Sequence, residues 1–86
     1  MKKNGTYRKV KFTITRLSGY GRYQLDAKYR GKKISIFIND ASLWDDIDDE
    51  ENKEERRYAL KSAYERIVRE YNVRYAWVSR ITEKGK

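Results

Sequence analysis

The 86-residue sequence contains no cysteine, no histidine and no proline. Without cysteine there are no disulfide bonds and no thiolate metal sites, and without histidine the commonest general base and transition-metal ligand is missing. Nucleophile–base pairs of the usual kinds therefore cannot form, and we expect a protein that is not an enzyme and holds no cofactor. No apolar run approaches the roughly 18 residues of a membrane span, and no signal peptide is evident, so we expect a cytoplasmic protein.

Large aliphatic side chains are also scarce: leucine, isoleucine, valine and phenylalanine together make up 17 of the 86 residues. Eight tyrosines and two tryptophans add apolar surface, so we expect a folded chain with a small core. This length allows one domain, residues 1–86, whose charged ends 1–5 and 83–86 are expected to fray.

Charge is divided into three blocks along the chain, although the net charge is +8. Residues 1–39 carry a net charge of +10, residues 40–55 carry −8, and residues 56–86 carry +6. The basic excess favours an anionic partner, most often nucleic acid. The acidic block does not match a calcium-loop pattern, so we expect it to favour a helix start rather than to bind a metal.

Strict alternation of apolar and polar residues predicts three short strands over residues 7–17, 22–30 and 32–39. Arg30 and Gly31 form the predicted tight turn between the last two, with Gly31 supplying a positive φ. The positions that share the inward face are Val10, Phe12, Ile14, Tyr23, Leu25, Ala27, Tyr29, Ile34, Ile36 and Ile38.

A helical repeat follows the acidic block, with Asn52 and Glu55 in the positions of a capping box and Asn72 as a stop. Its apolar face is formed by Leu60, Ala63, Tyr64, Ile67, Val68 and Tyr71. Residues 40–47 favour a helical turn capped by Asp40 that docks Leu43, Trp44 and Ile47.

Residues 73–82 are rich in strand formers, so we favour a fourth strand there over a helix that continues through Tyr75 and Val78. The sequence thus predicts an α+β fold: a three-stranded antiparallel meander packed on one long helix, with the fourth strand at the C-terminal end.

The outward face of the predicted sheet collects basic and hydrogen-bonding residues. Lysine and arginine would contact phosphates there, Thr13 and Gln24 would donate hydrogen bonds, and an exposed aromatic ring would stack on a base. The alternatives are a solvated sheet face, on which lysine prevents edge aggregation, and a protein-binding surface. The candidate nucleic-acid-binding residues are Lys9, Lys11, Arg22, Lys28, Lys33 and Phe37.

Four further residues are candidates for contact with a partner: Tyr20, Trp77, Arg66 and Arg69. Tyr20 lies at a predicted turn tip beside Arg22, and exposed tyrosine next to arginine is a common hot-spot pairing in interfaces. Arg66 and Arg69 lie on the basic side of the predicted helix, which is the alternative site for nucleic acid.

The segment Thr13-Ile14-Thr15-Arg16-Leu17-Ser18-Gly19-Tyr20-Gly21-Arg22, followed by Lys32-Lys33-Ile34-Ser35, resembles short uncharacterised proteins encoded on bacterial phages and mobile elements. The resemblance spans residues 7–72 and implies a β-β-β-α fold with an acidic stretch before the helix. Small accessory proteins of this kind often bind nucleic acid or disable a host complex, as anti-CRISPR proteins do. It therefore implies two hypotheses: a nucleic-acid-binding module, or an inhibitor or adaptor of a host protein or nucleoprotein complex.

Overall fold

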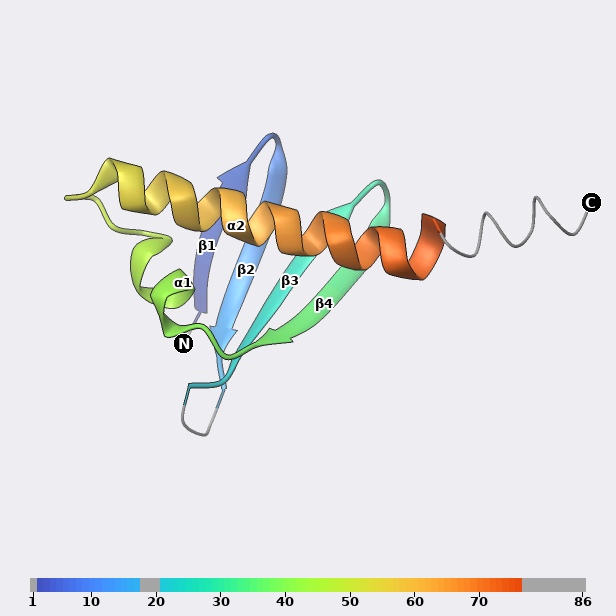
Figure 1. Cartoon of the computed structure of the whole chain (residues 1–86), viewed down its shortest axis with the longest axis horizontal. Helices are drawn as coiled ribbons and strands as arrows, with labels where there is room; N and C mark the ends of the chain where they lie inside the picture. The colour runs from blue at the N-terminus through green and yellow to red at the C-terminus, as the bar shows by residue number, and fades with distance from the viewer. Residues whose placement is uncertain (1, 18–20, 77–86) are drawn as a thin grey trace, which may run out of the picture.

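The computed structural model describes residues 2–17 and 21–76, which form a sheet layer and a helix layer (Figure 1). The sheet is an antiparallel meander in the order β1-β2-β3-β4. Its strands are β1 (Lys2–Tyr7), β2 (Val10–Arg16), β3 (Tyr23–Tyr29) and β4 (Lys32–Ile38). The helix layer contains α1 (Ala41–Asp46), α2 (Lys53–Tyr71) and a π-helical turn, η1 (Asn72–Ala76).

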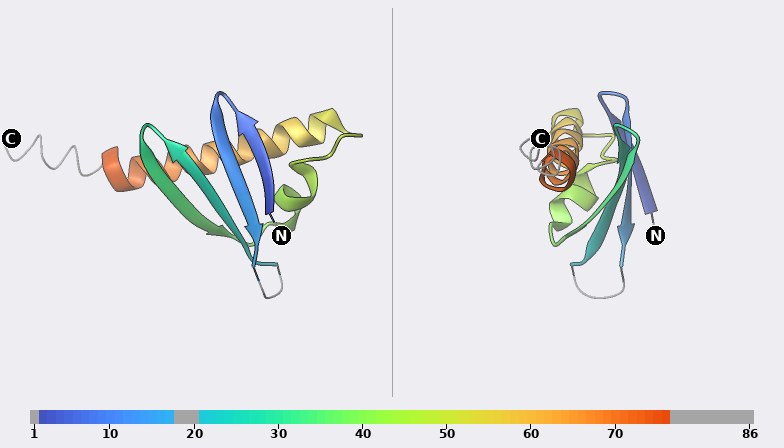
Figure 2. Two further views of the ribbon diagram at one scale, coloured as in Figure 1. Left: turned by 180° about the vertical axis from the view of Figure 1, so that it is seen from behind. Right: turned by 90° about the vertical axis from the view of Figure 1, so that its right-hand side faces the viewer.

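Both helices lie on the same face of the sheet, and α2 crosses all four strands (Figures 1 and 2). None of the described elements covers the opposite face, which we call the open face. The predicted α+β class and the meander on a long helix are confirmed, but the sheet has four strands rather than three. Within residues 2–17 and 21–76, no helix combines the length and apolar composition that spanning a bilayer requires.

The additional strand is β1, so the expectation that residues 2–5 fray is wrong. Lys3 holds β1 against α1, because its Nζ donates to the Trp44 carbonyl at 2.8 Å and pairs with Asp48 at 3.0 Å. The same ammonium lies 4.6 Å from the centre of the Trp44 ring. Gly5 lets the strand approach α2, since a Cβ atom there would lie 2.5 Å from a Leu60 methyl group.

Two tight turns join the strands in pairs, β1 to β2 and β3 to β4, at the same end of the sheet (Figure 1). The predicted turn at Arg30 and Gly31 is confirmed, with φ of 50° and 78°. A second turn of the same kind lies at Arg8 and Lys9, with φ of 49° and 66°. Positive φ at both central residues is typical of a type I′ turn. The predicted strand over residues 7–17 is therefore broken at its start.

The core forms between the sheet and the helices as the alternation predicted. Phe12, Ile14, Leu25 and Ile34 from the sheet are almost fully buried, and Ile67 of α2 packs among them. The predicted helical turn after β4 is also confirmed as α1. Its buried residues are Leu43 and Trp44, with Ile47 buried just after it.

The start of α2 agrees with the sequence, but its end does not. Asn52 caps the helix, since its side-chain oxygen accepts a hydrogen bond from the Glu55 amide at 3.1 Å. Asn72 keeps a right-handed helical backbone instead of stopping the chain, and the chain continues through Ala76 as η1. The predicted strand over 73–82 is therefore wrong for residues 73–76, and its remainder, 77–82, lies outside the described residues.

Candidate nucleic-acid interface

The open face presents three rows of side chains that run across the strands. The register pairs Asn4 with Thr13, Thr13 with Asp26, and Asp26 with Ser35, and these residues form the middle row. The row nearer the two tight turns contains Thr6, Lys11, Lys28 and Lys33. The row at the opposite end contains Lys2, Thr15, Gln24 and Phe37.

Three of the predicted site residues, Lys11, Lys28 and Lys33, are neighbours in the row nearer the turns, and we call them the lysine row. They are exposed and border a shallow hollow of about 420 Å³, whose other polar lining residues are Thr13, Ser35 and the acidic Asp26. No ion pair among the described residues involves any of the three. Their charges are therefore available to an external anion.

Lys9 lies at the same end of the sheet as the lysine row, whereas the other two predicted residues lie elsewhere. Lys9 is exposed in the β1–β2 turn, at the same end of the sheet. Phe37 is 78% exposed, but it is four residues along β4 from Lys33, a separation of about 13 Å. Arg22 precedes β3 at the far end, where its carbonyl accepts a hydrogen bond from the Leu17 amide at 3.0 Å. The six predicted residues thus form one cluster of four and two separate positions.

Asp26 is the acidic residue in the middle row of the open face. It accepts hydrogen bonds from the side-chain amide of Gln24 at 2.9 Å and from the Ser35 hydroxyl. These contacts link the carboxylate to Ser35 of its own row and to Gln24 of the row that contains Phe37. The middle row therefore separates a cationic end of the open face from the end that carries Phe37.

A row of tyrosines, which the sequence did not predict as a unit, joins the turn end of the sheet to α2. Tyr7 of β1 contacts Tyr64 of α2, with ring centres 5.4 Å apart. Tyr29 of β3 lies 6.1 Å from Tyr64 and 5.1 Å from Tyr71, and Tyr75 of η1 lies 5.2 Å from Tyr71. Tyr7 and Tyr75 thus extend the predicted core tyrosines, Tyr29, Tyr64 and Tyr71, into a continuous row.

Three cations lie over this tyrosine row. The Arg8 guanidinium is 5.7 Å from the Tyr7 ring centre and 5.8 Å from that of Tyr64. The Arg30 guanidinium is 5.5 Å from Tyr29 and 5.9 Å from Tyr71. These distances are those of cation–π contacts. The sequence signal was the Tyr-Arg pair that begins both tight turns.

The third cation is Lys32, whose Nζ lies 5.4 Å from the centre of the Tyr75 ring. It follows the β3–β4 turn, so it lies at the same end of the sheet as Arg8 and Arg30. The contact adds one more positive charge to this end.

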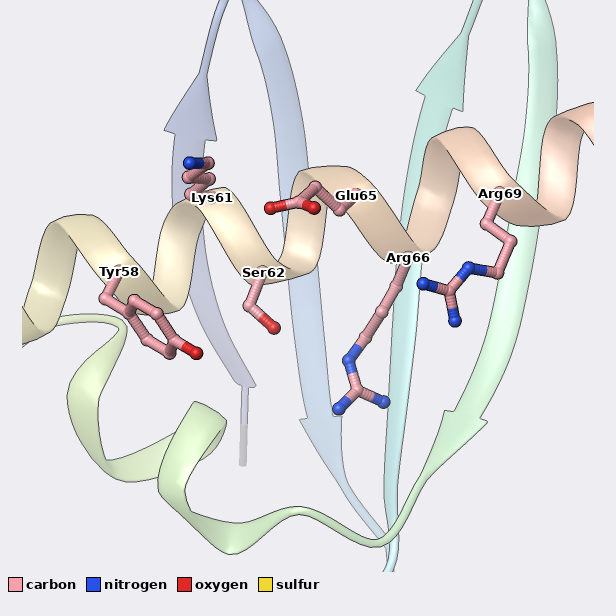
Figure 3. Close-up of a pocket in the computed structure, with 6 residues that line it drawn as sticks. All are labelled: Tyr58, Lys61, Ser62, Glu65, Arg66 and Arg69. Carbon is pink, nitrogen blue, oxygen red and sulfur yellow. The ribbon is translucent and has the colours of Figure 1, made fainter.

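Arg66 and Arg69 lie on a different surface, the solvent side of α2. They border a groove of about 330 Å³ with Tyr58, Lys61, Ser62 and Glu65 (Figure 3). Arg66 also pairs with Asp40 at 3.4 Å, so its charge is partly compensated within the chain. Tyr20 and Trp77, the other predicted partner contacts, lie outside the described residues.

The acidic block supplies helix caps. Asp40 caps α1, and the hydrogen bond from the Ser42 hydroxyl is the main cause that lowers the pKa of Asp40, with Arg66 adding to the effect. Asp49 accepts hydrogen bonds from the amides of Glu51 and Asn52 just before α2.

Carboxylates of this block also lie close to each other. The hydrogen bond with Asp46, together with the negative charge of Asp46, raises the pKa of Glu55. Among the residues that the structure describes, no group of three or more acidic side chains is arranged to hold a metal ion.

No family model, curated protein or solved structure matches this chain. The resemblance to short phage and mobile-element proteins therefore stays a prediction from the sequence.

Proposed function

We propose that this protein is a nucleic-acid-binding module that contacts the phosphate backbone with the lysine row. The observation that carries the proposal is the gathering of seven cations at the turn end of the sheet, with no carboxylate in either turn or in the row. These cations are Arg8, Lys9, Lys11, Lys28, Arg30, Lys32 and Lys33. Such a concentration of positive charge is the usual electrostatic footprint of a nucleic-acid interface.

The separation of Phe37 from the lysine row favours backbone contact over base stacking. Phe37 and Lys33 are about 13 Å apart along β4, so a base stacked on Phe37 and a phosphate held by Lys33 would belong to different nucleotides. Lysine contacts to phosphate carry no sequence information. We therefore expect binding with little sequence preference, and an affinity that decreases steeply as salt is added.

The test is fluorescence anisotropy with duplex DNA, single-stranded DNA and RNA over a salt series. Lys11→Ala, Lys28→Ala and Lys33→Ala should each weaken binding and flatten the slope of log K against log salt by about 0.7 to 0.9, the contribution of one phosphate contact. Lys53→Ala removes the same charge from an exposed position at the start of α2, outside both the lysine row and the groove of Arg66 and Arg69, and is the matched control. Absence of binding to all three nucleic acids at low salt would refute the proposal.

The second candidate function is an inhibitor or adaptor that binds a host protein or nucleoprotein complex. The observation in its favour is the exposure of Phe37 on the open face, because exposed aromatic residues are frequent anchors in protein interfaces. The experiment is a pull-down from the native host with Phe37→Ala and Lys33→Ala as paired variants. One specific host protein should be captured by the wild-type protein and by Lys33→Ala, also after nuclease treatment, but not by Phe37→Ala. That result would favour this function.

A further inference from the structure

We propose that Arg8 and Arg30 are phosphate-binding residues, each held on a pair of tyrosine rings, and that they contact two different phosphates of one nucleic acid. The proposal rests on the proposed function. It names the two positions at which the nucleic-acid backbone would be bound by bidentate hydrogen bonds as well as by charge. Neither arginine is among the residues that the sequence pointed to.

The two arginines occupy equivalent positions in the two hairpins. Each is the first central residue of a type I′ turn, with φ of 49° at Arg8 and 50° at Arg30. Each follows an inward tyrosine, Tyr7 or Tyr29, that packs on α2. The two turns lie at the same end of the sheet (Figure 1). The guanidinium groups lie on the helix side of that end, over rings of α2, whereas the lysine row lies on the open face.

The cation–π contacts place each guanidinium near two tyrosine rings, and the N–H donors stay open to solvent. Both side chains are exposed, and neither forms an ion pair with a described residue. A guanidinium that lies over a ring still points its N–H groups sideways, and its fork geometry matches two oxygens of a phosphate. A side chain that is already ordered loses less conformational entropy when it binds. The tyrosine pairs thus prepare each arginine for bidentate contact.

The spacing of the two arginines follows from two independent dimensions of the fold. The hairpins are two strands apart, which corresponds to about 9.6 Å across a sheet. The ring partners on α2, Tyr64 and Tyr71, are seven residues apart, which corresponds to about 10.5 Å along a helix. Because a phosphate group is much smaller than 10 Å, arginines held on these rings contact two separate phosphates.

A purely structural role would give a different result from phosphate binding. If the arginines only cover the tyrosine row, replacing them would lower the melting temperature without a specific change in affinity. If the arginines bind phosphate, replacing the planar guanidinium by another cationic group should by itself weaken binding. Substitution by lysine separates the two roles, because it keeps the charge but removes the bidentate geometry. Neither substitution changes the cost of the positive φ, since lysine and alanine also carry a Cβ atom.

The experiment measures the affinity for one duplex DNA of fixed sequence over a salt series, with unfolding by heat recorded for every variant. Arg8→Lys and Arg30→Lys should each weaken binding about 3- to 10-fold with an unchanged salt slope. Arg8→Ala and Arg30→Ala should weaken it further and flatten the slope by about 0.9 each. The double lysine variant should show the product of the two single effects, because the two phosphates are separate. Arg57→Lys and Arg57→Ala, on an exposed position of α2, are the matched controls.

The outcomes distinguish failure of the phosphate-binding role from failure of the proposed function. If the lysine-row variants weaken binding while the Arg8 and Arg30 variants behave like those of Arg57, the phosphate-binding role is refuted and the proposed function stands. A fall in melting temperature with unchanged affinity would also refute it, in favour of a structural role. If the wild-type protein binds no nucleic acid, both proposals fail together.

Discussion

Replacing Lys33 by threonine should stabilise the fold while it weakens nucleic-acid binding. Lys33 and Lys28 are directly opposite each other in the β3–β4 register, and Lys11 borders the same hollow. Like charges at directly opposite positions destabilise a sheet, and threonine is a better strand former than lysine. Residues selected for binding an anion often reduce the stability of the protein that carries them.

The expected gain is about 0.5 kcal/mol, the middle of the range for a cross-strand pair. For a domain of this size it corresponds to a rise of roughly 2–4 °C in melting temperature. Urea denaturation at low and high salt provides the assay. The gain should be largest at about 0.01 M salt and small at about 1 M, where charges a few ångströms apart are screened.

Lys2→Thr is the control that makes this prediction specific. Lys2 is exposed on the same open face, but the residue opposite it is Thr15 rather than a lysine. The substitution changes strand propensity and net charge in the same way without relieving a lysine pair. If Lys33→Thr destabilises the protein, or if its gain equals that of Lys2→Thr at every salt concentration, repulsion within the lysine row is not the cause.

Three further predictions concern the turns, the approach of β1 to α2 and the caps. Lys9→Gly should stabilise the protein by about 0.5 kcal/mol in urea denaturation, because glycine adopts the φ of 66° at this position without the steric cost of a Cβ atom; a loss of stability would contradict the type I′ turn. Gly5→Ala should cost about 1–3 kcal/mol in the same assay, since the new methyl group would displace Leu60; an unchanged midpoint would place β1 further from α2. Asp40→Ala should cost about 1 kcal/mol, whereas Asp40→Asn keeps the α1 cap. Because the pKa of Asp40 in the folded protein is lowered from its ordinary value of 3.8, the stabilisation by its charge is present above about pH 4 and is lost as the pH falls below that value. Unfolding curves from pH 7 to about pH 3 should therefore show the difference between wild type and Asp40→Asn disappear in acid.

Periodicity was sufficient to predict β2, β3, β4 and the core side of α2, and the Asp40 cap indicated α1. Periodicity missed β1 because the residues of this strand and its turn do not follow the usual apolar–polar alternation and turn preferences. Lys3 faces inward, Gly5 has no side chain to reveal the alternation, and the turn at Arg8 and Lys9 contains two long side chains where asparagine and glycine are typical. Tertiary contacts from Lys3 to α1 compensate for these weak local preferences.

The candidate site was predictable as a face but not as a cluster. Alternation assigns a residue to the open face, whereas the strand register and the direction of the turns decide which residues of that face are neighbours. Lys11, Lys28 and Lys33 could be grouped only once the register was known, and the same register separates Phe37 from them. The prediction of a strand over residues 73–76 was wrong because it used local composition only. A tertiary contact decides the structure there, since Tyr75 packs on Tyr71 in a continued helix.

The Tyr-Arg pairs connect the core to the surface, so the position of the cations depends on the fold rather than on loop flexibility. A two-turn step along α2 is about 10.5 Å and a two-strand step across the sheet is about 9.6 Å. Because these dimensions nearly agree, a single helix can seat a tyrosine from each hairpin, Tyr7 on Tyr64 and Tyr29 on Tyr71. The arginine that follows each tyrosine is then fixed relative to its counterpart. The packing that stabilises a small, tyrosine-rich core therefore also sets the spacing of the charges that we propose to bind phosphate.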